Sequence, residues 1–139
     1  MQVYSYTNVH CAALLFTRQV KSEPTTLEGV YDQITAPSFP ATIPDVTIWA
    51  RLLYSAEEVG RHDISLTILD MFNGEQIGVT AGHIELPQRP ERGHPSNDVT
   101  FNISDSRIPH PGEYEFRLGF DGQPVASVWL TVIGAFGLN

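Results

Sequence analysis

The fold is decided by residues 114–132, YEFRLGFDGQPVASVWLTV. In the first half of this stretch, apolar and polar residues alternate, and the same period of two returns in the second half, as in half-buried β-strands. Between the halves stands Asp121-Gly122, a dipeptide typical of a tight hairpin turn because its residues tolerate a positive φ. The stretch therefore predicts an antiparallel hairpin with one apolar face on a core.

Further short strand candidates occur upstream, with Gly, Pro and Asn-Gly turn signals between them. They are Val9–Phe16, Leu27–Thr35, Asp45–Tyr54, Asp63–Asp70, Gln76–Thr80, His83–Leu86 and Val99–Ile103. Residues 55–60 can form one helical turn, and residues 36–44, with three prolines, are expected to cross one end of the core as a loop. We predict one all-β domain over residues 1–139, an immunoglobulin-like β-sandwich of about seven to nine antiparallel strands. A barrel is the alternative.

The charge of the chain narrows the classes of partner. Eight Lys and Arg against sixteen Asp and Glu give a formal net charge of −8. Because the basic residues are scattered, we expect neither a nucleic-acid nor an anionic-membrane partner. No stretch approaches the ~20 apolar residues of a membrane span, and no signal peptide is visible. A cytoplasmic protein is the simplest expectation. The single cysteine, Cys11, cannot form an internal disulfide and is expected to be a buried, inert thiol.

A local resemblance concerns the entry to the predicted hairpin, Pro111-Gly112-Glu113-Tyr114-Glu115-Phe116. It resembles the corner at strand F of immunoglobulin-like domains, in which a tyrosine hydroxyl hydrogen-bonds to the backbone just upstream. The resemblance implies this role for Tyr114. Phe116 stands where that family has a cysteine, and His110 stands where an aspartate is common, so no disulfide is implied.

A second resemblance extends over more of the chain. The phrases LEGVYDQI (residues 27–34) and APSFP (36–40), with the strand IWARL (48–52), are similar to a bacterial family of short stand-alone proteins. That family is catalogued as a domain of unknown function and is thought to form a β-sandwich. The resemblance implies this fold and a bacterial or phage setting. It implies no catalytic residue, because the family has no assigned activity.

Signals for catalysis or metal binding are weak. Residues near predicted loops offer two candidate metal sets. The first is His83, His94 and His110, and the second, for calcium, is Glu91, Asp98 and Asp105. Neither set has the spacing of a metal motif. Glu113 and Glu115 are expected on a solvent face, where acid–base catalysis is not favoured, and Glu57-Glu58 is a further carboxylate pair. No nucleophile elbow, phosphate loop or dinucleotide fingerprint is present. We predict a protein that is not an enzyme and has no cofactor.

Apolar residues outside the strand pattern favour binding instead. Trp129 falls opposite the apolar face of its strand, so it either faces solvent or is covered by a neighbour. Trp49 is either the core tryptophan of an immunoglobulin-like third strand or lies opposite the apolar residues of its own strand. The contact residues that we predict are Trp129, Phe39, Phe136 and Leu138. An apolar tail gains little from solvent exposure. We therefore expect residues 133–139 to dock on the same domain or on a neighbouring copy, with residues 1–6 as a further strand candidate.

These features favour a module that binds a protein partner or a second copy of itself. The alternative is a carbohydrate-binding sandwich, which requires aromatic rings exposed side by side on one face. A small hydrolase is a distant third and requires a pocket lined by titratable groups with shifted pKa values.

Overall fold

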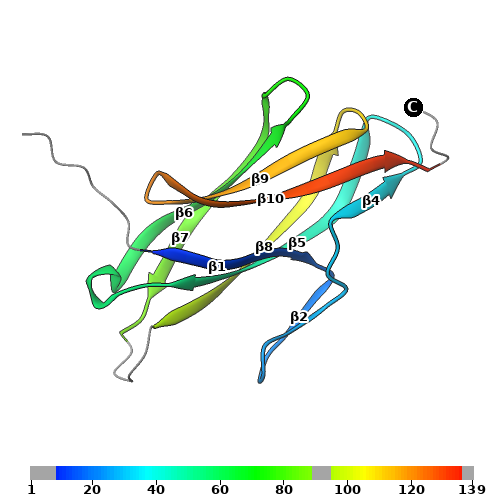
Figure 1. Ribbon diagram of the computed structural model, residues 1–139. Coiled ribbons are helices and arrows are strands. Elements are labelled where there is room, and N and C mark those ends of the chain that lie inside the picture. Colours follow the sequence, from blue (N-terminus) through cyan, green and yellow to red (C-terminus); the bar gives the residue numbers. More distant parts are fainter. Residues whose placement is uncertain (1–8, 89–94, 136–139) are drawn as a thin grey trace, which may run out of the picture.

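The computed structural model describes residues 9–88 and 95–135, and in them the chain forms two packed β-sheets and a small hairpin (Figure 1). The three-stranded sheet has the order β1 (His10–Thr17), β5 (Ala41–Leu53), β8 (Ser96–Ile108). The five-stranded sheet has the order β4 (Gln33–Ala36), β10 (Gln123–Gly134), β9 (Gly112–Phe120), β6 (Gly60–Asp70), β7 (Gln76–Leu86). The hairpin comprises β2 (Gln19–Lys21) and β3 (Thr26–Glu28), and a short 3-10 turn, η1 (Ala56–Glu58), precedes β6.

The topology is that of an immunoglobulin-like sandwich, as the sequence predicts. The N-terminal part of the chain contributes an edge strand to each sheet. In one sheet β1 pairs with β5, and in the other β4 pairs with β10. Among the described strands, β4 with β10 is the parallel pair, and the remaining pairs are antiparallel. The described strands form two separate sheets, which favours the sandwich over the barrel.

Several element boundaries differ from the sequence prediction: β8 extends from Ser96 to Ile108 where Val99–Ile103 is predicted, and β2 is a strand that the sequence pattern does not predict. The predicted strand Leu27–Thr35 is divided into β3 and β4 at Gly29, whose φ is +71° and whose missing side chain leaves room for Arg18. The two candidates within residues 76–86 form one continuous strand, β7. The expected crossing loop is shorter than predicted, because β5 already begins at Ala41 and pairs there with the end of β8.

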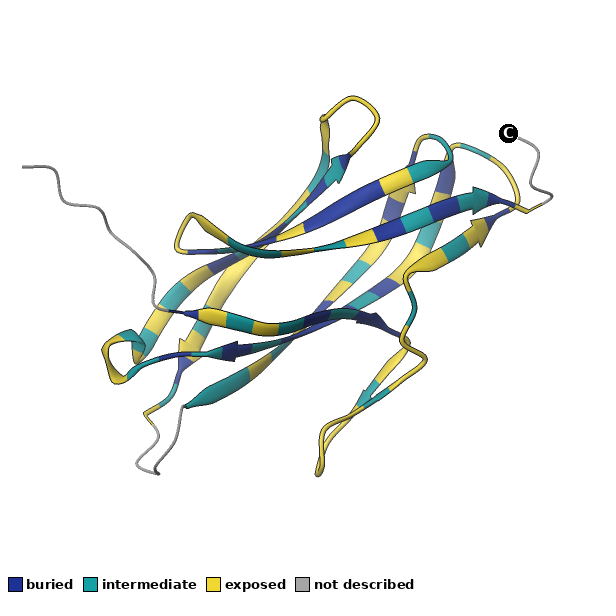
Figure 2. Ribbon diagram, in the orientation of Figure 1, coloured by how far each residue is buried: buried dark blue, intermediate teal, exposed yellow. Residues whose placement is uncertain are grey.

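The core lies between the two sheets (Figure 2). Its largest fully buried side chains include Tyr114, Phe16, Phe116, Phe120, Ile48, Leu52, Leu66, Leu86, Ile108, Leu118 and Leu130. Phe16 of β1 and Phe116 of β9 join the sheets through an edge-to-face contact, with ring centroids 5.0 Å apart. The alternation predicted for residues 114–120 is therefore confirmed on its apolar side.

The corner at the start of β9 is also confirmed. The hydroxyl of Tyr114 donates a hydrogen bond to the carbonyl oxygen of His110 at 2.5 Å. Nε2 of His110 lies 2.7 Å from Oδ2 of Asp70, a buried residue at the end of β6. Oδ1 of Asp70 accepts a hydrogen bond from the backbone N–H of Phe72 at 2.9 Å. The histidine that stands where an aspartate is common therefore links the corner to the β6–β7 turn.

Candidate strand-addition site

One edge of the five-stranded sheet, formed by β10, is covered by another strand over only a third of its length. The short strand β4 pairs with β10 from Thr131 to Gly134. The preceding part of β10, residues 123–130, pairs with β9 on one side and has no strand partner on the other within the described chain. The physical reason is the path of the chain, which leaves β1 in the other sheet and reaches β10 only after the β2–β3 hairpin (Figure 1).

The direction of the open backbone groups follows from the pairing downstream. The N–H of Thr131 donates a hydrogen bond to the carbonyl oxygen of Asp32 at 2.9 Å, so Thr131 directs its backbone groups toward the β4 side. Successive residues of a strand direct these groups to alternate sides. Ser127 and Trp129 share the phase of Thr131, because the bulge that shifts the register with β9 lies upstream of them, between Pro124 and Ala126. Their N–H and C=O groups therefore point outward from the open edge.

A groove of about 540 Å³ lies beside this edge. Its lining residues are Leu15, Phe16, Val30, Tyr31, Asp32, Ser127, Val128 and Trp129. They come from β1 in one sheet, from β10 in the other and from the crossover that precedes β4. Val30 and Trp129 are 53% and 44% exposed, so the groove presents apolar surface to water.

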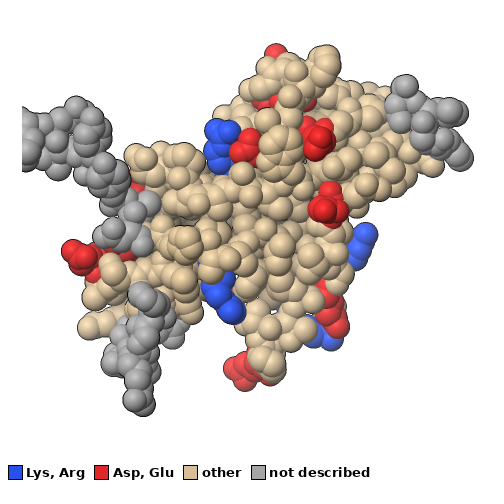
Figure 3. Space-filling view, in the orientation of Figure 1, with Lys and Arg blue, Asp and Glu red and all other residues tan. Residues whose placement is uncertain are grey.

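This side of the sandwich, which we call the seam, is formed by β1, β4 and β10 and carries little charge. None of these three strands contains Asp, Glu, Lys or Arg. The opposite edge strands, β7 and β8, contain Glu85, Asp98, Asp105 and Arg107. Charged residues on an edge strand discourage pairing with another chain. Figure 3 shows that the surface between β1 and β10 is formed mostly by uncharged side chains.

Trp129 lies on the outer face of the five-stranded sheet, opposite Glu115 of β9. The prediction that Glu115 is solvated is wrong, because this side chain is buried between its cross-strand neighbours Trp129 and Leu69. Two hydrogen bonds of 3.2 Å from Arg117 neutralise the carboxylate. Glu113, on the same face, is exposed as predicted.

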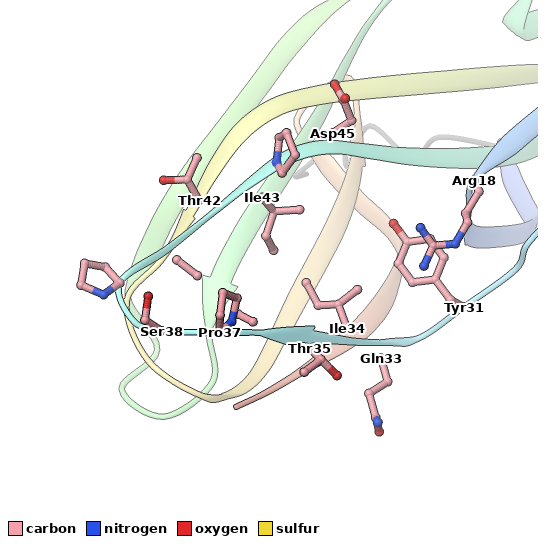
Figure 4. Close-up of a pocket in the computed structure, with 14 residues that line it drawn as sticks. Arg18, Tyr31, Gln33, Ile34, Thr35, Pro37, Ser38, Thr42, Ile43 and Asp45 are labelled. Atoms are coloured by element: carbon pink, nitrogen blue, oxygen red, sulfur yellow. The ribbon is translucent and has the colours of Figure 1, made fainter. Parts of the chain in front are cut away.

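A second groove, of about 710 Å³, lies where β5 extends beyond the end of β1 (Figure 4). Ile34 of β4 and Ile43 of β5 point toward one another across it. At one end, the guanidinium of Arg18 lies over the ring of Tyr31, 5.0 Å from its centroid. The ring of Tyr31 also stacks on Phe16, with centroids 5.7 Å apart. Because both contacts involve the Tyr31 ring, little of its surface remains for a ligand.

The structure places the predicted contact residues in different settings. Trp129 is exposed and borders the seam groove. Phe39, predicted as a contact residue, is half-buried and packs against the core from the loop between β4 and β5. Phe136 and Leu138 lie outside the described residues. Sequence reasoning missed Asp32 and Ser127, and the available signal was the absence of charge along residues 123–134.

Trp49 and Cys11 are partly or fully covered. Trp49 has the phase opposite to the core residues of β5 but is only 6% exposed, and the Arg51 guanidinium lies 5.1 Å from its ring centroid. Arg51 also forms a bidentate ion pair with Asp98, which lowers the pKa of that carboxyl. Burial raises the pKa of the half-buried Cys11 thiol, which donates to the Ala13 carbonyl oxygen. A raised thiol pKa disfavours the nucleophilic thiolate.

The structure does not bring the described candidate metal ligands of either set together. His83 lies 2.9 Å from Asp63, at one end of β6, and His110 lies 2.7 Å from Asp70, at the other end. Seven residues of strand separate those ends, about 23 Å at ~3.3 Å per residue.

Asp98 and Asp105 are separated along β8 in the same way. His94 and Glu91 lie outside the described residues. Within residues 9–88 and 95–135, no group of three or more His, Cys, Asp or Glu side chains could hold a metal ion.

Two histidines have acceptors at both ring nitrogens. Nδ1 of His62 lies 2.7 Å from Asp121, and its Nε2 lies 2.6 Å from the carbonyl oxygen of Glu58. Burial opposes the charged form of His62, but the two hydrogen bonds outweigh it and raise the pKa. A hydrogen bond to the Pro111 carbonyl raises the pKa of His110, burial opposes this, and Asp70 adds to the rise. Both geometries favour the doubly protonated ring.

This arrangement predicts a fall in stability between about pH 6 and about pH 8. Since the folded pKa is raised, the stabilisation is fully present below the unfolded pKa and is lost as the pH rises through the folded pKa. For His62, whose side chain is 15% exposed, we expect a loss of about 1 kcal/mol in the free energy of unfolding. Urea unfolding at both pH values measures it. His62→Asn should remove part of the slope, and equal slopes in wild type and His62→Asn would contradict the prediction.

Comparisons with known proteins give the following similarities. The chain is 11% identical to an alkylpurine DNA glycosylase, AlkC, from Pseudomonas fluorescens, covering 91% of this chain and 30% of that one with a TM-score of 0.52. It is 11% identical to a β-glucosidase from Listeria innocua, covering 97% of this chain and 17% of that one with a TM-score of 0.55. An immunoglobulin-like protein from Pseudomonas aeruginosa is 13% identical, with 90% and 96% covered and a TM-score of 0.48.

The chain thus spans less than a third of the first two proteins, and identities this low show the fold alone. No curated protein matches the chain in sequence. Among the described residues, no helix is long and apolar enough to cross a membrane. The model of the family of unknown function DUF6941 matches residues 17–133, which include most strands of both sheets and the crossover beside the seam groove. The chain therefore belongs to the DUF6941 family.

Proposed function

We propose that this protein binds an extended segment of a protein partner, which adds as a strand to the open edge of β10. The observation that supports this most directly is the outward direction of the backbone groups of Ser127 and Trp129, which have no strand partner within the described chain. An added strand would satisfy these groups with up to four hydrogen bonds, each contributing about 1 kcal/mol net. The seam groove would take alternate side chains of that strand.

The lack of charge at the seam supports the same proposal. A long exposed edge without charged residues is normally a liability, because it pairs with other chains. The chain has a net charge of −8, yet the three seam strands contain no charged residue, whereas the opposite edge strands do. This difference favours a seam surface that a partner covers. Trp129 would supply the large apolar contact that interface energetics commonly depend on.

Carbohydrate binding is the second candidate, and exposed Trp129 beside the Glu115–Arg117 pair is the observation in its favour. It would require a second exposed ring next to Trp129. Tyr31 lines the same groove, but its ring is engaged by Phe16 and Arg18. This geometry favours a strand over a sugar as the occupant.

The test uses a pool of synthetic hexapeptides in which Val, Ile or Leu alternates with Ser or Thr. We expect the immobilised protein to bind the pool. Trp129→Ala should weaken binding at least about thirtyfold, since loss of an interface anchor costs roughly 2 kcal/mol. Ser127→Pro should weaken it as well, because proline removes one outward N–H at a place where an edge strand tolerates it. Surface plasmon resonance measures both affinities.

Val79→Ala is the matched control, because Val79 is 58% exposed on the outer face of the same sheet but away from the seam. Thermal melts of all variants confirm folding. If Trp129→Ala and Val79→Ala bind the pool equally well, the β10 edge is not the site. Binding of a glycan array by wild type and not by Trp129→Ala would favour the carbohydrate alternative.

A further inference from the structure

The open segment of β10 is closed at one end. Asp32 accepts a hydrogen bond from Thr131, and β4 then occupies the edge from Gln33 onward. The preceding residue, Tyr31, has already turned toward the other sheet, because its N–H donates to Phe16 at 3.2 Å. A strand added beside Ser127 and Trp129 therefore cannot continue straight past Leu130. At that end it must stop or turn sharply.

A second copy of this chain fits such a space poorly. Suppose that the open β10 edges of two copies paired antiparallel, centre to centre. The β9–β10 turn, Asp121-Gly122, immediately precedes β10, so the turn of each copy would meet β4 of the other copy. A chain end has no continuation of this kind. The shape of the site therefore favours a terminal segment of a partner.

The charge at the closed end selects which terminus. Asp32 is exposed, lines the seam groove and forms no ion pair in the described part of the chain. Arg18 does not pair with Asp32, because its guanidinium lies over the Tyr31 ring and borders the second groove instead. A strand antiparallel to β10 would place its first residue beside Asp32, and a parallel strand would place its last residue there. A carboxylate terminus would be repelled, whereas an α-ammonium group would be attracted.

We infer that the occupant of this site is the free N-terminal segment of a protein partner, which runs antiparallel to β10 with its α-ammonium group beside Asp32. This inference rests on the proposed function and specifies its ligand. The segment is at most about eight residues long, because the open edge extends from Gln123 to Leu130 and paired strands advance by the same ~3.3 Å per residue. Apolar side chains at alternate positions face the seam groove.

The experiment compares three versions of the same hexapeptide pool. The first has a free N-terminus, the second has an acetylated N-terminus, and the third is extended at its N-terminus by the four residues Gly-Ser-Gly-Ser. We expect acetylation to weaken binding about threefold to fivefold at low salt, the range of an exposed ion pair. The extended pool should bind at least about tenfold more weakly, because its added residues meet the crossover at Asp32. The effect of acetylation should shrink at about 0.5 M salt.

Asp32→Asn should abolish the preference for the free amine and keep the preference against the extended pool. Asp45→Asn is the control, since it removes an exposed carboxylate that borders the second groove instead. Equal binding of the three pools would overturn this inference and leave strand addition intact. Binding of none of them would overturn both. Light scattering that shows an edge-paired dimer, broken by Ser127→Pro, would make a second copy the occupant and would also overturn it.

Discussion

Replacing Phe116 by alanine is expected to lower the free energy of unfolding by about 4 kcal/mol, the largest effect that we predict for a single side chain. Phe116 is fully buried at the centre of β9, and its ring meets the edge of Phe16 from the opposite sheet. The position corresponds to a cysteine in immunoglobulin-like domains, where a disulfide joins the two sheets. In this chain the contact between Phe116 and Phe16 joins them instead. The loss combines the transfer of the ring to water with the cavity that it leaves.

Urea unfolding monitored by circular dichroism measures this effect. Phe72→Ala is the matched control, because Phe72 is 86% exposed in the β6–β7 turn and its loss should change stability by no more than about 0.5 kcal/mol. A change below about 2 kcal/mol for Phe116→Ala would show that the core collapses around the gap and that the inter-sheet contact matters little.

The second large effect is expected for Asp70→Ala, which should cost roughly 3 kcal/mol. Asp70 is 1% exposed, and its carboxylate accepts from the Phe72 N–H and contacts Nε2 of His110. Its removal leaves the Phe72 N–H without its acceptor and Nε2 of His110 without its carboxylate partner. Because His110 also accepts the bond from Tyr114, the change loosens the corner that starts β9.

Asp70→Asn should cost less than alanine, because an amide oxygen can still accept the bond from Phe72. It should also flatten the dependence of stability on pH, since the raised pKa of His110 depends in part on the carboxylate. Urea unfolding at about pH 6 and about pH 8 separates the two contributions. Equal stabilities of Asp70→Ala and an exposed-site control, Asp45→Ala, would contradict the assignment of this network.

The sequence predicts the sandwich itself because its signals are local. A period of two from Tyr114 to Val132 with an Asp-Gly turn can only describe a hairpin with one buried face, and Tyr114 forms the corner that its surroundings imply. The break at Gly29 is less visible, because it follows from the close approach of Arg18 and not from the strand pattern.

The candidate site, by contrast, depends on which strands become neighbours. Alternation shows that Ser127 and Trp129 share a face, but whether their backbone groups are paired depends on how far β4 reaches along β10. Glu115 is likewise polar by pattern and buried by its neighbours Leu69 and Trp129 on the adjacent strands. Trp49 has an outward phase and is nevertheless covered.

Side-chain periodicity and turn chemistry are properties of a few consecutive residues, so the sequence by itself determines most of the strands, the C-terminal hairpin and the all-β class. Pairing at a sheet edge joins residues about a hundred positions apart, such as Asp32 and Thr131, and depends on the path between the sheets. Only the tertiary structure therefore decides that two thirds of the edge of β10 stays open, and that Asp32 stands at the end of the open part.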